Sequence, residues 1–105
     1  MELKIIWSDF AEKQLDEIFE YYSQKASLQV AQKLLQTIIS EPDKLSENPY
    51  IGQIEDMLKF RPIEYRYLVC KNYKIIYSVD EKQGFIKISD VFDTRMNPPK
   101  IKRRK

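Results

Sequence analysis

The sequence has 105 residues, 43% of them hydrophobic, which is enough for one domain with a single modest core. Without histidine and with one cysteine, it cannot build a zinc site or a Ser-His-Asp or Cys-His catalytic centre, and we expect no metal and no cofactor. The net charge of +2 hides two halves of opposite sign: residues 1–57 carry 5 basic and 11 acidic side chains, and residues 58–105 carry 13 basic and 5 acidic ones. Such a bipolar molecule can present its basic half to a polyanion or to an acidic partner.

The cellular compartment is indicated by the lone thiol and by the length of the apolar runs. Cys70 stands in an alternating apolar stretch, so we expect it to be a small buried hydrophobic residue without a disulfide partner. The opening sequence MELKIIW does not have the pattern of a secretion signal, and no run of about 18 apolar residues that would cross a membrane is present. We therefore expect a cytoplasmic protein, because free thiols are usual in reducing compartments.

The first predicted elements are a short strand, residues 2–7, and the helix that follows it. Ser8 and Asp9 are good helix N-caps, and Glu12, three residues after Asp9, completes the pattern of a capping box. Apolar residues then recur at helical spacing, which predicts an amphipathic helix of about four turns. Its apolar stripe comprises Ala11, Leu15, Ile18 and Tyr22.

A second helix is predicted from Ser27 onward, antiparallel to the first. Pro42 cannot continue a regular helix, yet Leu45 continues the apolar stripe, so we expect a kinked or restarted last turn. Asn48-Pro49 and Gly52 then end the helical region. The apolar face of this helix comprises Leu28, Ala31, Leu35 and Ile38.

The remaining sequence predicts a loop and three strands. Residues 53–64 show no clean period and contain Pro62, which is typical of a connecting loop. Aromatic and β-branched residues predict strands at 65–70, 73–79 and 85–92, joined by a tight turn at Lys71-Asn72 and a hairpin loop ending at Gly84. In the third of these strands the apolar alternation changes face near Ser89 and Asp90, which indicates a β-bulge.

The order of one strand, two helices and three strands predicts an α+β fold. In this fold the antiparallel helical hairpin packs on one face of a sheet, and the sheet consists of the N-terminal strand and a three-stranded antiparallel meander. We expect the N-terminal strand to pair with a strand of the meander after the chain has crossed the helical hairpin. Residues 1–99 are expected to form one domain, and residues 100–105, of which five are basic, a mobile tail.

Taken together, these motifs resemble the RelE/ParE superfamily, the plasmid stabilisation proteins that act as toxins of bacterial type II toxin–antitoxin pairs. The resemblance spans about residues 3–99 and is carried most specifically by the strand sequences YRYLV, NYKIIY and VFDTRMNP. It implies the α+β fold just described and a growth-inhibiting activity. It also implies a cognate antitoxin that wraps the toxin and cancels this activity, and a disordered acidic segment of an antitoxin would suit the basic half of the chain.

Members of the superfamily divide by target: RelE-like proteins cut messenger RNA on the ribosome, whereas ParE-like proteins block DNA gyrase. The ending TRMNP looks ParE-like, and the segment MNPPKIKRRK lacks the tyrosine or histidine that several nuclease members carry there. We therefore favour a gyrase inhibitor. A metal-independent, ribosome-dependent endoribonuclease is the alternative, and a non-toxic antitoxin-binding domain is a second one, because the fold alone does not choose between them.

For the endoribonuclease, the resemblance implies a catalytic set of Arg66, Lys74 and Arg95. Cleavage of RNA by its own 2′-hydroxyl needs positive charge at the crowded phosphate and groups that take and give a proton. Arginine is commoner in the family at the position of Lys74, and a lysine lacks the planar fork that grips a phosphate bidentately. Glu64, two residues before Arg66, is a candidate base, or else an ordinary ion-pair partner of that arginine.

Structural roles are the competing interpretation for several side chains. For Arg95 this role is a salt bridge with Asp93 or Asp90 that clamps the last strand. We favour core positions over base-stacking ones for Trp7 and for the strand tyrosines, which are Tyr65, Tyr67, Tyr73 and Tyr77. The basic tail either contacts nucleic acid, gyrase or antitoxin, or serves solubility.

Overall fold

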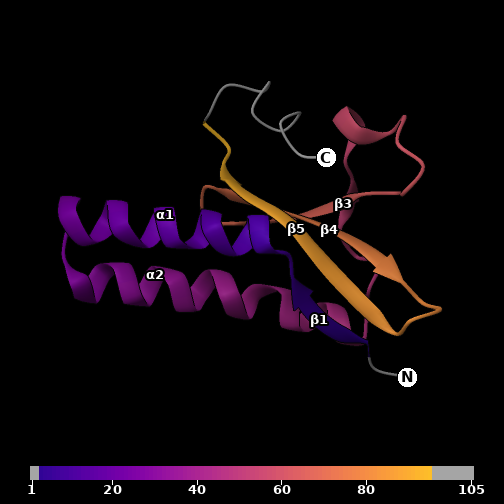
Figure 1. Ribbon diagram of the computed structural model, residues 1–105, viewed down its shortest axis with the longest axis horizontal. Helices are drawn as coiled ribbons and strands as arrows, with labels where there is room; N and C mark the ends of the chain where they lie inside the picture. The colour runs from indigo at the N-terminus through magenta and orange to yellow at the C-terminus, as the bar shows by residue number, and fades with distance from the viewer. Residues whose placement is uncertain (1–2, 96–105) are drawn as a thin grey trace.

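The computed structural model describes residues 3–95, which fold into two helices packed against a five-stranded sheet (Figure 1). This is the α+β fold that the sequence predicts. The expected tail at 100–105 and the domain boundary at residue 99 lie outside the described residues. In chain order the elements are β1 (Lys4–Trp7), α1 (Asp9–Lys25), α2 (Leu28–Ser40), the 3₁₀ helix η1 (Glu41–Ser46), β2 (Gln53–Ile54), the 3₁₀ helix η2 (Asp56–Leu58), β3 (Arg66–Cys70), β4 (Tyr73–Asp80) and β5 (Phe85–Asp93).

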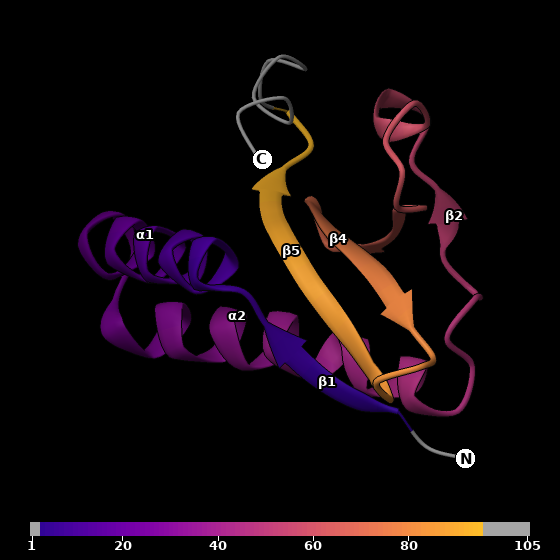
Figure 2. The same ribbon diagram turned by 45° about the vertical axis from the view of Figure 1, so that its right-hand side comes forward.

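The strands are arranged in the order β1-β5-β4-β3-β2. β1 runs parallel to β5, and the other neighbouring strands are antiparallel (Figure 2). The N-terminal strand therefore pairs with the meander after the chain has crossed the helical hairpin, as predicted. One prediction is corrected, because Gln53 and Ile54, within the expected loop 53–64, pair with Tyr67 and Arg66 as strand β2. A strand of two residues is too short to leave a periodic signal in the sequence.

A β-bulge in β5 confirms the predicted change of face. Ile76 lies opposite Asp90, whereas the next residue, Tyr77, lies opposite Ile88, so Ser89 is the extra residue. The bulge keeps the apolar residues on both of its sides directed toward the helices.

Side-chain caps fix where both helices begin. Ser8 Oγ accepts a hydrogen bond from the backbone N–H of Ala11 at 3.0 Å, and Ser27 caps α2 in the same way. Because Ser8 is the cap, Asp9 is already the first helical residue, and the capping box predicted between Asp9 and Glu12 is wrong.

The main core lies between the helices and the face of the sheet that they cover. α2 ends at Ser40 and continues as η1, in which Pro42 and Leu45 are buried, so the expected restarted turn is confirmed. Trp7 packs at the margin of this core, as predicted. The buried residues of the main core are Leu3, Ala11, Leu15, Ile38, Leu45, Leu68, Cys70, Tyr73, Ile75, Tyr77, Ile86, Ile88 and Val91.

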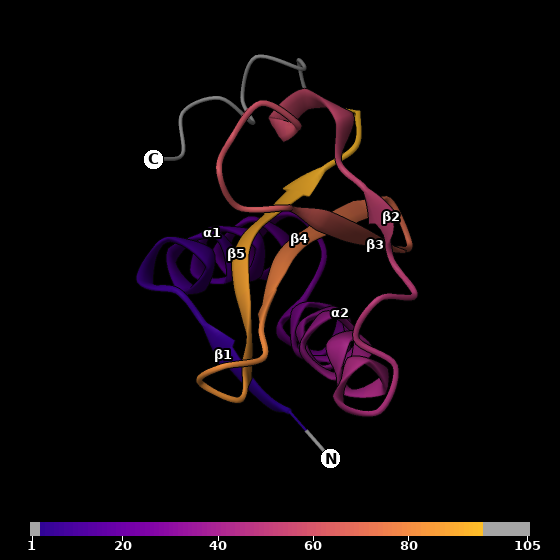
Figure 3. The same ribbon diagram turned by 90° about the vertical axis from the view of Figure 1, so that its right-hand side faces the viewer.

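The opposite face of the sheet, here called the outer face, carries a second and smaller apolar cluster. The segment between β2 and β3 folds over this face, on the side away from both helices (Figure 3). Leu58 of η2, 2% exposed, packs there against Ile76 and Phe92, and Tyr65 and Tyr67 lie at the margin. The strand tyrosines therefore belong to one apolar cluster or the other, as expected.

Candidate functional site

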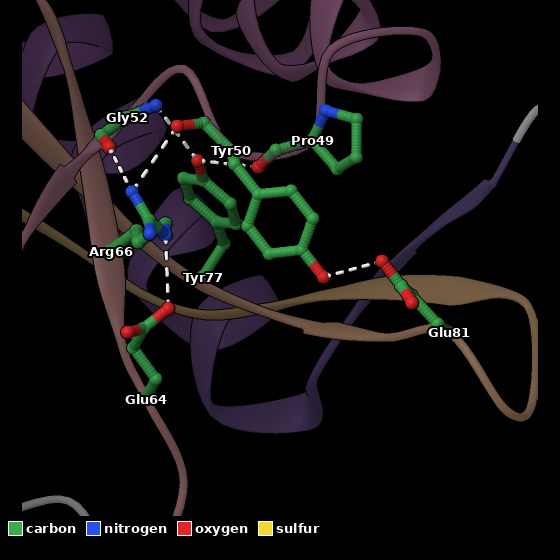
Figure 4. A network of polar contacts seen from close by, with 7 residues as sticks. All are labelled: Pro49, Tyr50, Gly52, Glu64, Arg66, Tyr77 and Glu81. Carbon is green, nitrogen blue, oxygen red and sulfur yellow. Dashed lines mark hydrogen bonds and ion pairs between the residues drawn. The ribbon is translucent and has the colours of Figure 1, made fainter.

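Arg66, the first residue of β3, is held by the loop that follows η1. Its Nη1 donates hydrogen bonds to the backbone carbonyls of Tyr50 and Gly52, at 3.1 and 2.8 Å (Figure 4). Its Nε donates to Glu64 Oε1 at 3.1 Å, and the guanidinium carbon lies 5.2 Å from the centre of the Tyr50 ring. The structure therefore brings Arg66 and Glu64 together, and Nε and Nη1 of the Arg66 guanidinium donate to groups within the protein.

The same loop is anchored from the main core by Tyr77. The Tyr77 hydroxyl donates to the carbonyl of Pro49 at 2.8 Å and accepts from the backbone N–H of Gly52 at 3.0 Å. A side chain at position 52 would place its Cβ 2.5 Å from Tyr77 Oη, so only glycine allows this close approach. Farther out, Tyr50 Oη donates to a carboxylate oxygen of Glu81 at 2.6 Å, and this bond raises the pKa of Tyr50 (Figure 4).

Lys74 lies on the other side of the sheet from Arg66. Residues of β4 alternate between the two faces, and Tyr77, which is opposite Arg66, faces the helices. Three residues earlier on the same strand, Lys74 therefore points to the outer face. The two cations cannot grip one phosphate from the same side of the sheet.

On the outer face, Lys74 is enclosed by partners from the segment between β2 and β3 and from β3. Its Nζ lies 2.8 Å from Glu55 Oε1 and 4.1 Å from the centre of the Tyr67 ring. Glu55 is only 3% exposed, which makes this a largely buried ion pair. Glu55 is not identifiable as a site residue from the sequence, because it stands in a stretch without a periodic pattern, 19 positions before Lys74.

Arg95 follows the end of β5 and forms the salt bridge with Asp93 that the sequence offers as an alternative. Its Nε and Nη2 donate to the two carboxylate oxygens at 3.0 and 2.6 Å, and its backbone N–H donates to Oδ1 at 2.8 Å. These bonds lower the pKa of Asp93 to about 2. The Arg95 side chain is 70% exposed, so of the three cations it has the most contact with solvent.

Two clefts lie near these side chains. A cleft of about 270 Å³ between α1 and the end of β5 is bordered by Arg95, Asp93, Tyr22 and Tyr73 among others. Burial and a hydrogen bond with Tyr22 raise the pKa of Tyr73 there. A second cleft of about 530 Å³ lies beside the β4–β5 hairpin, and none of the four predicted site residues borders it. The clefts therefore do not assemble the predicted catalytic set, whose role stays a prediction.

Other kinds of site are limited by what residues 3–95 contain. No group of three or more His, Cys, Asp or Glu side chains in this range is arranged to hold a metal ion. No helix in the described part of the chain has the length and apolar character needed to span a membrane.

Comparison with known proteins places this geometry in a family. Among solved structures, the chain is similar to the chromosomal ParDE toxin–antitoxin system from P. aeruginosa, with 19% identity and a TM-score of 0.72 over 88% of this chain and 96% of that one. It is also similar to an arginine-to-alanine double mutant of the E. coli toxin RelE in the free state, with 15% identity and a TM-score of 0.51 over 90% and 86% of the two chains. No curated protein sequence matches. Residues 5–98 match the family model described as the ParE toxin of the type II toxin–antitoxin system parDE, and the chain therefore belongs to the ParE toxin family.

Proposed function

We propose that this protein is the toxin of a cytoplasmic type II toxin–antitoxin pair and that it inhibits growth by binding DNA gyrase, without cutting RNA. The match to the ParE family model supports the toxin role. The observation that favours binding over cleavage is the pairing of the candidate cations. Arg66, Lys74 and Arg95 each contact a carboxylate of the protein itself, within 2.6 to 3.1 Å.

RNA cleavage requires positive charge that is directed at one phosphate and is not already neutralised. Glu64 pairs with Arg66, so this carboxylate is not placed as a free general base. Lys74 and Arg66 lie on opposite faces, and turning Lys74 toward a phosphate would break its ion pair with the buried Glu55. A protein whose surface makes a stable contact needs none of these rearrangements.

The proposal includes a cognate antitoxin as the second partner. The chain carries 13 basic and 5 acidic residues from position 58 onward, which suits an acidic segment laid across the C-terminal half. The antitoxin would then suppress toxicity by covering the surface that binds gyrase or by competing with it through charge.

Two measurements on the same protein test this function. The chain is induced alone in a bacterium, where growth and the 5′ ends of messenger RNA are followed, and the purified protein is titrated into a gyrase supercoiling reaction. We expect growth arrest, inhibited supercoiling and no new codon-phased 5′ ends. Codon-phased cuts with intact supercoiling would replace the gyrase proposal by the nuclease one, and unaffected growth would contradict both.

A matched pair of variants sharpens the same test. Arg95→Ala removes an exposed cation of the predicted catalytic set. Lys87→Ala removes a cation of β5 that is not in this set. If the protein acts by binding as proposed, neither variant abolishes toxicity, because neither residue is needed for a chemical step. Any effect is then a change in the toxin concentration needed for half-inhibition. Complete loss of RNA cleavage in the Arg95 variant alone would support the nuclease.

A further inference from the structure

The loop between η2 and β3 presents one large aromatic side chain to solvent. Phe60 is 92% exposed, whereas the next most exposed large hydrophobic residues of the described chain are 55% exposed. The segment that carries it projects from the sheet on the side away from both helices (Figure 3). A phenylalanine ring left in water gains little of the free energy that burial would give it, so its surface is available to a partner.

The loop holds Phe60 in a defined position. Two residues before Phe60 in the chain, Leu58 is buried in the apolar cluster of the outer face. The backbone N–H of Lys59 donates to the carbonyl of Asp56 at 3.3 Å, and that of Arg61 donates to the carbonyl of Leu58 at 3.1 Å. The loop would therefore lose less conformational entropy when this ring binds a partner than an unanchored loop would.

The neighbours of Phe60 give the surface its chemistry. Lys59 Nζ lies 5.3 Å from the centre of the phenylalanine ring, and Arg61 follows directly in the chain. Ile63, 52% exposed, adds apolar surface to the same loop. Aromatic residues, phenylalanine included, are enriched at the centre of protein–protein contacts.

The charge of the surrounding segment favours a protein over a nucleic acid. Residues 55–66 contain three acidic and three basic side chains, so the segment has no net positive charge. Nucleic-acid affinity depends chiefly on unneutralised cations along the phosphate backbone. Lys59, whose ammonium lies over the Phe60 ring, instead suits an acidic border around an apolar pocket.

We infer that residues 59–63, the Phe60 loop, are the contact through which this toxin binds its protein target, with Phe60 inserted in an apolar pocket that carboxylates border. This inference rests on the proposed function and adds to it the surface that makes the contact. Lys59 contributes attraction at long range, and the ring contributes the contact that slows dissociation.

The test compares Phe60→Ser with Leu28→Ser, which removes another exposed apolar side chain, 55% exposed, from the start of α2. Growth arrest after induction, the thermal midpoint of unfolding and inhibition of gyrase supercoiling are measured for both. We expect Phe60→Ser to raise the concentration for half-inhibition by at least about tenfold and to leave the thermal midpoint unchanged. Leu28→Ser is expected to inhibit like the original chain. Lys59→Glu is expected to weaken inhibition most at low salt.

Each outcome tests either the role of the Phe60 loop or the identity of the target. If Phe60→Ser inhibits as well as the original chain, the loop is not the contact, while the proposed function stands. If the original chain leaves gyrase active and cuts RNA, the proposed function fails. In that case, growth arrest by Phe60→Ser tests the loop separately. If this variant no longer arrests growth but still cuts RNA, the loop is still supported as a protein contact. If the variant also loses RNA cleavage, the inference about the loop is overturned.

Discussion

The two faces of the sheet are covered by different means. On one face, α1, α2 and η1 bury a continuous apolar core that includes residues from β1, β3, β4 and β5. On the outer face, a short irregular segment covers a small cluster around Leu58, and an ion pair between Glu55 and Lys74 holds it in place. Stability therefore resides mainly on the helical side, and the outer side is the part free to specialise in binding, because local stability follows apolar burial.

The test of this comparison with the largest expected effect uses two neighbouring residues of β4. Ile75 and Ile76 are both 0% exposed, but Ile75 packs in the main core and Ile76 in the outer cluster. We expect Ile75→Ala to lower the free energy of unfolding by about 4 kcal/mol and Ile76→Ala by about 2 kcal/mol, because a thin covering segment collapses more easily onto a cavity. Urea unfolding measures both. Equal losses would show that the two faces are equally rigid.

The next test removes the cation that holds the outer segment. Lys74→Met removes the ion pair between Lys74 and the buried carboxylate of Glu55, and we expect a loss of about 2 kcal/mol in unfolding free energy. The double variant Glu55→Gln/Lys74→Met should recover most of this loss. Amide exchange in residues 55–61 should accelerate in the single variant and leave the helices unaffected. A uniform acceleration throughout the chain would contradict a local role for the ion pair.

A smaller effect is expected where the main core anchors the loop after η1. Tyr77→Phe removes a buried hydroxyl that bonds to Pro49 and Gly52, at a cost of about 1 kcal/mol. Chemical denaturation measures the cost, and Tyr50→Phe, which loses an exposed hydrogen bond to Glu81, is the control with no measurable loss. The same loss in both variants would argue that the Tyr77 hydroxyl does not anchor the loop.

The smallest effect is a dependence on pH at the end of β5. Asp93 has a folded-state pKa of about 2 against an ordinary value of 3.8, so the folded state binds fewer protons in this range. Stability from the ion pair is therefore present above about pH 4 and is lost as the pH falls toward about 2. Because Arg95 is largely exposed, solvent screens this ion pair, and we expect its contribution to stability to be the smallest of the four. Asp93→Asn should lack this part of the acid-unfolding profile, and a difference that persists unchanged at pH 2 would contradict the assignment.

Local patterns in the sequence account for most of the fold. Helical spacing identifies α1 and α2, alternation identifies the three long strands, and the change of face near Ser89 identifies the bulge. Pairs of residues two positions apart, such as Asp93 with Arg95, are equally visible as candidate ion pairs. These features are predictable because each depends on neighbours along the chain.

Features that depend on distant parts of the chain were not predictable. β2 forms because two residues of an irregular stretch pair with Arg66 and Tyr67, and no periodic pattern in the sequence predicts this strand. Glu55 is recognised as a partner of Lys74 only when the segment is seen folded over the outer face. The same tertiary arrangement places Arg66 and Lys74 on opposite faces, which residue spacing on two separate strands does not reveal without the register.

The most direct test of the account is inhibition of DNA gyrase by the purified chain. The proposed function predicts that supercoiling falls as the toxin is titrated, that an excess of the antitoxin restores it, and that messenger RNA in cells producing the toxin shows no codon-phased cuts. Undiminished supercoiling at a large excess of toxin, together with codon-phased cleavage that Arg95→Ala abolishes, would contradict it.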